Sequence, residues 1–371
     1  MRRCIDRLTL PLFALMLLFT AVSCSKEIDF GFKDLCYYHP HTAPVRLNVD
    51  WSKFNHIEKP TGMSVYVWPE DPAQEFNKYI SHDIDGVTLN LLEGTYNTLV
   101  FNQIDQEFAS LKFEDMDDFH KAKIRVKQTK SGWYATKDPD TKIGEEPEWI
   151  AIDSKSNIMV TEEMVKKAED DYLASIGKSQ RSVTRVNDVA TLVPKSIIKK
   201  VDLYIHLENL VYLRSSMAAF ENMAEGCFIS TKKTTSSQVT HTINSWNLIY
   251  DKDDNGYENL MKGVLKASIS TFGLPDGHSG NPEDTNLLVE LLLVDNVTTV
   301  LMKFPIGDIM ADLNSYDGSV VDAVGRPIWP EVHIYWPEPL PEVEPVGGSS
   351  GGLDIGVSEW GDEIVTILPM F

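Results

Sequence analysis

Apolar and polar residues alternate along much of this chain, and a period of two predicts β-strands with one buried and one solvent-facing side. In the first half, Glu93 and Gly94 interrupt one such stretch, which indicates a strand, a turn and a second strand. The stretches with this pattern are residues 45–51, 63–67, 87–102 and 123–127. They predict a β-sandwich in the first half of the chain.

One helix is expected between the two strand-rich halves. Thr161 can cap the N-terminus of a helix that begins with two acidic residues, and Gly177 would end it. The polar residues 178–188 that follow indicate a domain boundary or, alternatively, a mobile loop.

The alternation resumes after residue 200. Val201, Leu203, Ile205 and Leu207 would face one side of a strand, and the polar residues between them would face the other. Further strand-like runs are residues 240–250, 267–272, 287–294 and 299–304, with one short helix suggested at residues 216–223. A hairpin turn fits residues 295–296, between the last two runs. The second half therefore predicts a second β-sandwich.

Prolines surround the last strand-like run, residues 332–336, so that strand must lie at a sheet edge or end in irregular backbone. Glycine and serine at residues 347–352 predict a flexible linker. The tail beyond the linker is a predicted strand, which could complete its own sheet, the simpler alternative, or bind a partner. Its candidate partner-binding residues are Leu353, Ile355, Val357 and Trp360.

The N-terminus has the composition of a lipoprotein signal peptide. Arginines precede an apolar run at residues 8–22 that is too short to span a membrane, and small residues lead from it to Cys24. Cleavage before Cys24 would leave a lipidated cysteine at the mature N-terminus. Ordinary secretion without lipid attachment is the alternative.

The chain is acidic, with a net charge of −21 over 371 residues. Loss of residues 1–23, which hold three arginines and one aspartate, would leave 348 residues and a net charge of −23. Such a surface repels nucleic acid and anionic lipid headgroups, so membrane attachment would have to come from the lipid alone. A mature chain of this length predicts about two domains.

Cysteine usage predicts no disulfide framework. Cys4 would leave with the signal peptide and Cys24 would carry lipid, so only Cys36 and Cys227 remain. A bridge between these two is chemically feasible in an oxidising compartment, but they fall in different predicted domains, and idle thiols are the simpler interpretation. The sequence contains neither a CxxC motif nor a cysteine and histidine spacing typical of zinc. We therefore expect no metal and no cofactor.

Two short motifs invite a chemical interpretation, and each has a simpler one. Residues 251–256 match the opening of a calcium loop, but the twelfth position is Lys262 instead of an acid, which favours a polar hairpin turn. Residues 277–280 resemble the nucleophile elbow of serine hydrolases, yet Asn281 occupies the position of the second glycine and no helix is expected to follow. Neither motif predicts an enzyme.

Several segments resemble the Bacteroidales fimbrillin-like lipoprotein family. Residues 37–51 look like the start of the mature chain in that family, and residues 92–96 are similar to the Gly-x-Tyr turn of its first domain. Three further segments resemble signatures of its second domain, and they are residues 207–210, 217–226 and 351–357, the last with Trp360. The resemblance implies two transthyretin-like β-sandwich domains, used as stalk, anchor or tip subunits of surface fimbriae or as adhesins.

The pattern and the resemblance together predict an all-β fold of two tandem transthyretin-like (Greek-key) β-sandwich domains with a few short helices. The predicted divisions are a signal peptide at 1–23, a lipidated tether at 24–35, an N-terminal domain at 36–180, a C-terminal domain at 181–346, and a linker with a final strand at 347–371.

Two functions follow as hypotheses, and both are binding functions. The first is a lipid-anchored protein of the outer membrane, exposed at the cell surface, that acts as a fimbrial anchor, accessory or adhesin-like subunit. Its partners would be fimbrial subunits or other surface proteins, bound through strand edges. The second is capture of glycans by exposed aromatic residues such as Trp329, Trp336 and Trp360, although tryptophans in sandwiches more often pack in the structure.

Overall fold

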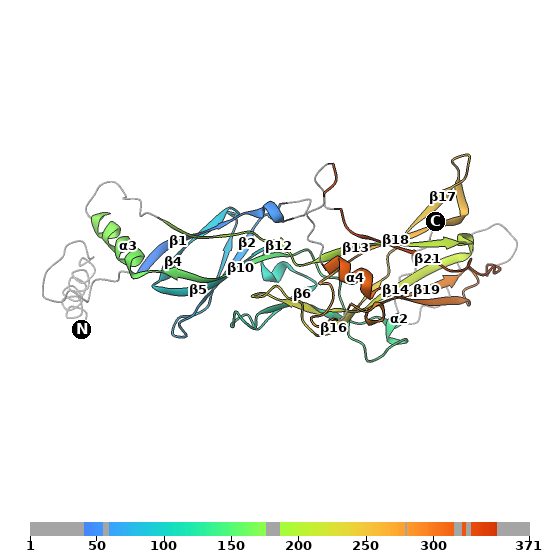
Figure 1. The fold of residues 1–371 in the computed structure, drawn as a ribbon, viewed down its shortest axis with the longest axis horizontal. Coiled ribbons are helices and arrows are strands. Elements are labelled where there is room, and N and C mark those ends of the chain that lie inside the picture. Colours follow the sequence, from blue (N-terminus) through green and yellow to red (C-terminus); the bar gives the residue numbers. More distant parts are fainter. Residues whose placement is uncertain are drawn as a thin grey trace, which may run out of the picture.

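The computed structural model describes residues 41–54, 59–175, 186–278, 280–314, 321–323 and 328–346. In this part of the chain, strands form five sheets that build two β-sandwiches along an elongated body (Figure 1). The predicted all-β class, with tandem sandwiches and a few short helices, is confirmed. Short 3-10 turns connect some strands, and they are η1 (Trp51–Lys53), η2 (Asp105–Glu107), η3 (Leu210–Tyr212) and η4 (Pro282–Asp284).

The first sandwich packs a three-stranded sheet, in the order β11-β1-β4, on a five-stranded sheet, in the order β12-β10-β5-β2-β3. The three-stranded sheet consists of β1 (Thr42–Val49), β4 (Gly86–Leu92) and β11 (Asn187–Leu192). The five-stranded sheet consists of β2 (Met63–Pro69), β3 (Asn77–Ser81), β5 (Gly94–Asn102), β10 (Ala151–Val160) and β12 (Lys195–Ser196). Leu47, Val65 and Val100 meet in the core between the two sheets. The alternation predicted at residues 45–51 holds along β1, whose inward residues are buried.

The predicted helix is α3 (Glu162–Ser175), at the outer end of the first sandwich (Figure 1). Its N-terminus is capped as expected, because the backbone N–H of Met164 donates to Oγ1 of Thr161 at 3.3 Å. Val165 adds its side chain to the core of the first sandwich. The predicted end of the helix at Gly177 lies outside the described residues.

Strand β2 departs from the prediction that one of its faces would be wet, since residues 63–68 are all buried. The five-stranded sheet has a core on each side: Val65 faces the first core, and Tyr66 and Trp68 face a second one. The buried hydroxyl of Ser64 donates a hydrogen bond to the backbone carbonyl of Gln103 at 2.8 Å. Polar and aromatic residues at alternate positions therefore misled the prediction, because they are satisfied inside the protein.

The second sandwich packs a four-stranded sheet, β17-β18-β13-β21, on a six-stranded sheet, β20-β19-β14-β16-β9-β8. The four-stranded sheet consists of β13 (Lys199–Glu208), β17 (Asn247–Lys252), β18 (Glu258–Thr271) and β21 (Glu331–Tyr335). Four strands of the six-stranded sheet are β14 (Leu213–Ala224), β16 (Gln238–Ile243), β19 (Asn286–Leu293) and β20 (Thr299–Pro305), and α4 (Gly307–Asn314) follows β20. Leu203, Ile205, Phe220 and Val289 lie in the core between these sheets.

The strand predictions for the second half hold with two corrections. Residues 216–223 are not a helix but part of β14, because this strand lies between β16 and β19 and buries Ala218, Ala219 and Phe220. The run at residues 240–250 is two strands, β16 and β17, in different sheets. The hairpin between β19 and β20 and the edge position of β21 are as predicted.

The two sandwiches are joined by more than one crossing of the chain. Residues 127–146, which we call the arm, leave the first half and lie along the second sandwich. The arm contributes β8 (Gln128–Thr129) and β9 (Ile143–Gly144) to the six-stranded sheet, beyond β16, and carries helix α2 (Gly132–Ala135). A further three-stranded sheet, β15-β7-β6, also mixes the halves, and its strands are β6 (Leu111–Glu114), β7 (Lys123–Val126) and β15 (Gly226–Phe228). The second core of the five-stranded sheet consequently holds side chains from both halves, such as Ile124 and Cys227.

The division of the chain at residues 180 and 181 remains a prediction. Strand pairing bears on it, because β11 pairs with β1 and β12 pairs with β10, both in the first sandwich. The next strand after β12 is β13, which begins at Lys199 and belongs to the second sandwich. We therefore propose a boundary after Ser196, with the arm crossing over it.

Candidate functional site

The outer face of the four-stranded sheet carries a group of exposed aromatic and ionisable side chains. The alternation along β13 buries Leu203 and Ile205, and so turns Tyr204 and His206 outward. Strand β21 runs parallel to β13, in a register that places His333 beside Tyr204 and Tyr335 beside His206. On the other side of β13, the antiparallel strand β18 places Lys266 beside Tyr204.

The four rings form a continuous stack, which we call the aromatic ladder: Tyr204, His333, His206 and Tyr335. Ring centroids of Tyr204 and His333 are 4.6 Å apart with an interplanar angle of 11°, and those of His206 and Tyr335 are 4.3 Å apart at 13°. The two imidazoles connect these pairs, with centroids 5.4 Å apart at 29°. At one end of the ladder, Nζ of Lys266 lies 4.6 Å from the ring centroid of Tyr204, a cation–π contact.

Polar contacts hold the rings in place. The hydroxyl of Tyr204 donates to Oε1 of Glu331 at 3.1 Å, and Nε2 of His333 lies 3.3 Å from Oε2 of the same carboxylate. Nζ of Lys266 donates to the Tyr204 hydroxyl at 2.5 Å and lies 3.7 Å from Oδ2 of Asp202. These contacts fix the orientation of the first two rings of the ladder.

A hydrogen bond joins the two histidines of the ladder. Nε2 of His206 and Nδ1 of His333 are 3.0 Å apart, so a single proton fits between them. Burial and the neighbouring His333 lower the pKa of His206, and Asp251 opposes that shift. A hydrogen bond from His333 lowers the pKa of Glu331, which keeps this carboxylate charged at neutral pH.

The last ring of the ladder is open to solvent. Tyr335 is 72% exposed, whereas most large side chains of its strand neighbourhood, such as Val332 and Leu203, are buried. One face of the Tyr335 ring stacks on His206. The site therefore ends in an aromatic ring that is held by its neighbour and accessible from outside.

The outer face of the six-stranded sheet is arranged differently, because the arm covers it. Tyr134 of α2 is buried with Ala219 and Leu288 of that sheet, and its hydroxyl donates to Oε1 of Glu221 at 2.8 Å. The neighbouring Trp133 donates from Nε1 to Oε1 of Glu290 at 2.8 Å. Aromatic and acidic side chains on this face therefore form hydrogen bonds with one another within the chain.

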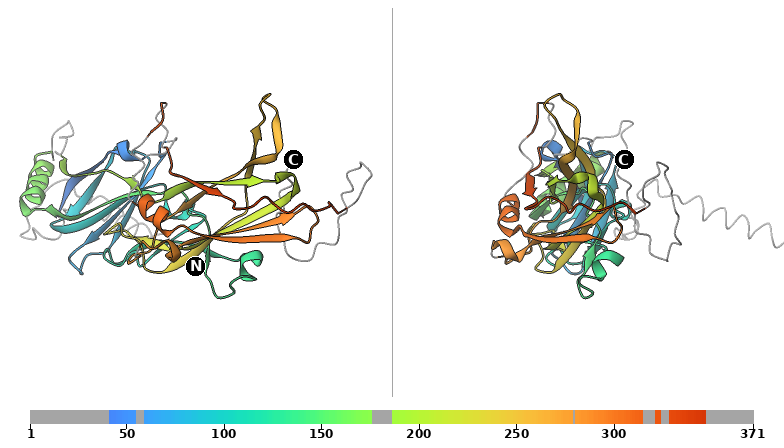
Figure 2. Two further views of the ribbon diagram at one scale, coloured as in Figure 1. Left: turned by 45° about the vertical axis from the view of Figure 1, so that its right-hand side comes forward. Right: turned by 90° about the vertical axis from the view of Figure 1, so that its right-hand side faces the viewer.

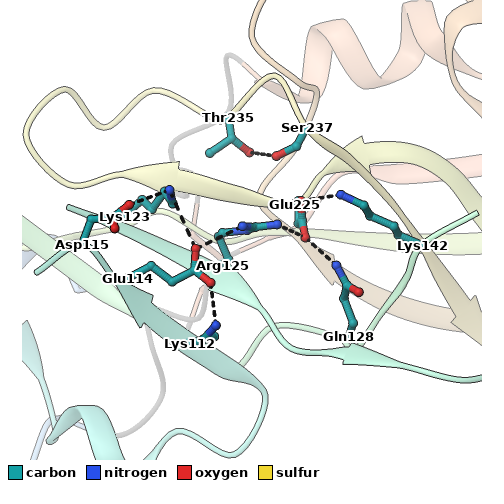
Figure 3. Close-up of polar contacts among 10 residues, drawn as sticks. All are labelled: Lys112, Glu114, Asp115, Lys123, Arg125, Gln128, Lys142, Glu225, Thr235 and Ser237. Carbon is teal, nitrogen blue, oxygen red and sulfur yellow. Dashed lines mark hydrogen bonds and ion pairs between the residues drawn. The ribbon is translucent and has the colours of Figure 1, made fainter. Parts of the chain in front are cut away.

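Buried charges fix the base of the arm (Figure 3). Glu225, only 1% exposed, forms an ion pair with Arg125 of β7 and accepts a hydrogen bond from Nε2 of Gln128 at 3.0 Å. Nζ of Lys142 lies 3.7 Å from the other carboxylate oxygen. Burial alone would raise the pKa of Glu225, but hydrogen bonds from Arg125, Gln128 and Ser237 outweigh it and lower the pKa. A charged Glu225 therefore ties β7 and both ends of the arm to the second sandwich.

The site residues predicted from the sequence are not among the described residues. The lipidation residue Cys24 and the candidate partner-binding strand are outside the described residues, so both stay predictions. Members of that strand are Leu353, Ile355, Val357 and Trp360. Cys36 is also outside, while Cys227 is buried, which raises the pKa of its thiol to about 12. The alternative of a bridge between the two cysteines therefore stays open.

The tryptophans proposed for glycan capture pack within the protein where they are described. Trp336 lies against Phe304, with ring centroids 5.6 Å apart, at the edge of the core between the two sheets of the second sandwich. Trp329 lies edge-on to Trp149 at 5.2 Å. The aromatic ladder was missed because its strands are distant in sequence. Its signal is nevertheless present, as tyrosine and histidine alternate with apolar residues in both β13 and β21.

The two chemical motifs have local structural roles. Asp251 and Lys252 end β17, and the turn to β18 follows, in which Oδ1 of Asp253 accepts hydrogen bonds from the backbone N–H groups of Asn255 and Tyr257. In the loop that resembles a nucleophile elbow, Nδ1 of His278 accepts a hydrogen bond from the backbone N–H of Gly280 at 2.8 Å. The serine of that loop lies outside the described residues. Within the described residues, no group of three or more histidine, cysteine or acidic side chains is placed to hold a metal.

Comparison with solved structures shows which fold this is. A "putative adhesin" from Bacteroides ovatus is 12% identical, with a TM-score of 0.51 over 81% of this chain and 94% of that chain. A "putative adhesin" from Bacteroides thetaiotaomicron is 11% identical, with a TM-score of 0.46 over 73% and 82%. The fimbrial anchor protein Mfa2 from Porphyromonas gingivalis is 10% identical, with a TM-score of 0.45 over 79% and 90%. The first similarity confirms, at the level of fold, the resemblance to fimbrillin-like proteins.

Comparison of sequences identifies the family. No curated protein matches the sequence. A family profile described as "Domain of unknown function (DUF5119)" matches residues 23–244. Because these residues make up more than half of the chain, the protein belongs to the DUF5119 family.

Proposed function

We propose that this protein is a lipid-anchored subunit of the bacterial cell surface that docks other surface proteins, as an anchor, accessory or adhesin-like component of fimbriae. The observation that carries the proposal is the interlock of the two sandwiches by the arm and by the buried pair of Arg125 and Glu225. The fold shared with the Bacteroides ovatus protein supports it by analogy.

The interlock suits a subunit that transmits force. Domains joined by one linker usually move relative to each other. Here the arm adds β9 to β16 of the second sandwich, and strand β7 of the first half pairs with β15 of the second. Pulling the two sandwiches apart would break these strand pairings and separate the carboxylate of Glu225 from Arg125 and Gln128.

Strand edges offer the docking surface. Strand β20 is the edge of the six-stranded sheet, and its residues alternate between exposed and half-buried. Leu301, in the middle of β20, is 47% exposed. An exposed edge strand with apolar side chains is suited to pairing with a strand of another protein. We propose β20 as one docking edge, with the predicted strand at residues 353–371 as a segment that could be offered in return.

The proposed location rests on the predicted signal peptide and on Cys24. Among the described residues, no helix is long and apolar enough to cross a bilayer. Attachment through a lipid on Cys24 would leave the acidic body of the protein outside the membrane, where its net negative charge keeps it from anionic headgroups. The outer membrane and its outward face are the proposed site of action.

The experiment is protease accessibility on intact cells that express either the native protein or the Cys24→Ala variant, followed by crosslinking and mass spectrometry. We expect the native protein to be cleaved by added protease and to crosslink to other surface proteins, and the variant to be lost from the cells. A native protein protected from protease, or exposed but crosslinked to nothing, would contradict the proposal.

We also propose that the protein is not an enzyme. In the loop at residues 277–280, the histidine is engaged by the backbone of its own loop, which leaves its Nδ1 unavailable as a base. A screen of hydrolase substrates should therefore find no activity. Activity that disappears with Ser279→Ala would overturn this part of the proposal.

A further inference from the structure

We propose that the aromatic ladder is a carbohydrate-binding platform, in which Tyr335 stacks on the apolar face of one hexopyranose unit of a neutral oligosaccharide and polar side chains at the Tyr204 end of the ladder bind hydroxyl groups of the neighbouring units. This goes beyond the docking role proposed above, because it assigns a ligand class to a face of the protein that docking through strand edges does not use.

The first argument is the preorganised ring at the end of the ladder. Tyr335 stacks on His206 at 4.3 Å, and the stack continues through His333 to Tyr204. The ring is thus held upright on the sheet although it is 72% exposed. Stacking of a sugar on such a ring loses little side-chain entropy, since the ring is already ordered.

The second argument is the set of hydrogen-bonding groups beside the rings. Glu331 is half exposed and accepts hydrogen bonds from two members of the ladder. Asp202 lies within reach of Lys266 and accepts a hydrogen bond from Ser268. Carboxylate acceptors next to ammonium and hydroxyl donors match the alternating donors and acceptors of a sugar's hydroxyl groups.

The third argument is charge, which selects among sugars. The face around the ladder holds four carboxylates and two ammonium groups. The carboxylates are Asp202, Glu208, Asp251 and Glu331, and the ammonium groups are Lys262 and Lys266. Both lysines are engaged, because Lys262 pairs with Glu208 at 2.7 Å and Lys266 binds Tyr204. A sialylated, sulfated or uronic sugar would meet net repulsion, so the ligand is a neutral sugar.

The ladder is not needed to hold β21 in place. On the opposite face of the strand, Val332 and Ile334 are buried in the core between the two sheets of the second sandwich, and five residue pairs with β13 set its register. The exposed rings therefore add little to folding, while they give the outer face its aromatic character.

The experiment measures binding of the full-length protein to immobilised oligosaccharides that end in galactose, glucose or mannose, and to sialylated counterparts. We expect binding to neutral probes, a loss of at least tenfold in affinity for Tyr335→Ala, and nearly native affinity for Tyr335→Phe, which keeps the ring. The matched control is Tyr257→Ala, since Tyr257 is 73% exposed but lies near the tip of the β17–β18 hairpin that projects from the body (Figure 2).

Thermal unfolding of each variant separates binding from folding. Unchanged melting of Tyr335→Ala together with lost sugar binding supports the platform. The proposal is overturned if no neutral probe binds, if sialylated probes bind best, or if Tyr257→Ala weakens binding as much as Tyr335→Ala. Loss of a crosslinked protein partner in Tyr335→Ala, without any sugar binding, would assign the ladder to protein docking instead.

Discussion

The two outer faces of the second sandwich use similar side chains in opposite ways. On the six-stranded sheet, the arm brings Trp133 and Tyr134 onto Glu290 and Glu221, and the face is closed. On the four-stranded sheet, tyrosines and histidines stand beside acidic residues with nothing laid over Tyr335 in the described part of the chain. One face is therefore covered by a segment of the same chain, whereas the other stays open, and we propose that this open face binds a ligand.

The largest expected effect contrasts one tyrosine from each face. Tyr134→Ala should lower the free energy of unfolding by about 3–5 kcal/mol, because it empties a buried aromatic site beneath the arm. Tyr335→Ala should lower it by less than about 1 kcal/mol, the range of an exposed cross-strand pair. Chemical denaturation of both variants measures the contrast. Equal losses would mean that the aromatic ladder stabilises the fold as much as the side chains beneath the arm do.

The second prediction concerns the contacts that hold the base of the arm on the second sandwich, which Arg125→Ala should weaken. This change leaves the carboxylate of Glu225 buried without its main partner, and we expect a loss of about 3 kcal/mol in the free energy of unfolding. Lys121→Ala is the matched control, since its ion pair with Asp118 is solvent-exposed and should contribute little. A loss below about 1 kcal/mol for Arg125→Ala would show that Lys142 and Gln128 suffice to hold the arm.

Low pH should lower the stability of the protein through His241, which lies in β16 under the arm. Its Nδ1 donates to the carbonyl of Gly144 at 3.2 Å, and burial lowers its pKa to about 4. The unfolded chain takes up a proton below about pH 6.5, whereas the folded protein does not until about pH 4. Stability is therefore lost as pH falls through this window, by up to about 3 kcal/mol.

Denaturation midpoints of native protein and His241→Gln, recorded from pH 7 to pH 4, test this expectation. The variant should lack most of the pH dependence between pH 6.5 and pH 4.5, because the lowered pKa of Glu225 affects stability only at more acidic pH. Parallel pH profiles for the two proteins would contradict the role of His241.

The smallest expected effect concerns the open face. His333→Ala should move the pKa of His206 upward, because a neighbouring histidine that disfavours its protonation is removed. Proton NMR titration of the imidazole signals measures the shift. The charged groups that also face His206 stay in place in this variant, including Asp251, which favours protonation. A pKa of His206 that falls in the variant would show that His333 favours protonation of His206, and would contradict this expectation.

The sequence predicted where the strands of this fold lie better than it predicted which elements pack against them. The alternation of residues 201–207 predicted β13, and the prolines around residues 332–336 predicted an edge strand. The apparent wet face of β2 and the helix at 216–223 failed because tertiary contacts decided them: Tyr66 meets a second core, and β14 lies between two strands. Local pattern carries no information on such coverage.

The candidate sites were harder to predict for the same reason. The ladder needs the parallel pairing of β13 and β21, more than a hundred residues apart, and the arm needs β9 to join β16 across the predicted domain boundary. Each strand shows its tyrosines and histidines in the sequence, but only the register brings Tyr204 to His333. The tryptophans were the more visible hypothesis from the sequence, and the two that are described are partly buried and pack against other aromatic rings.

The most direct test of the account places a photo-activated crosslinking residue at Leu301, on the edge strand β20, and another at Tyr134, beneath the arm, in intact cells. The account predicts that the probe at Leu301 captures a different surface protein, and that the probe at Tyr134 reacts only within the chain. Capture of an outside protein from Tyr134, or none from Leu301, would contradict the claim that this protein docks its partners through an open strand edge while the arm seals the face beside it.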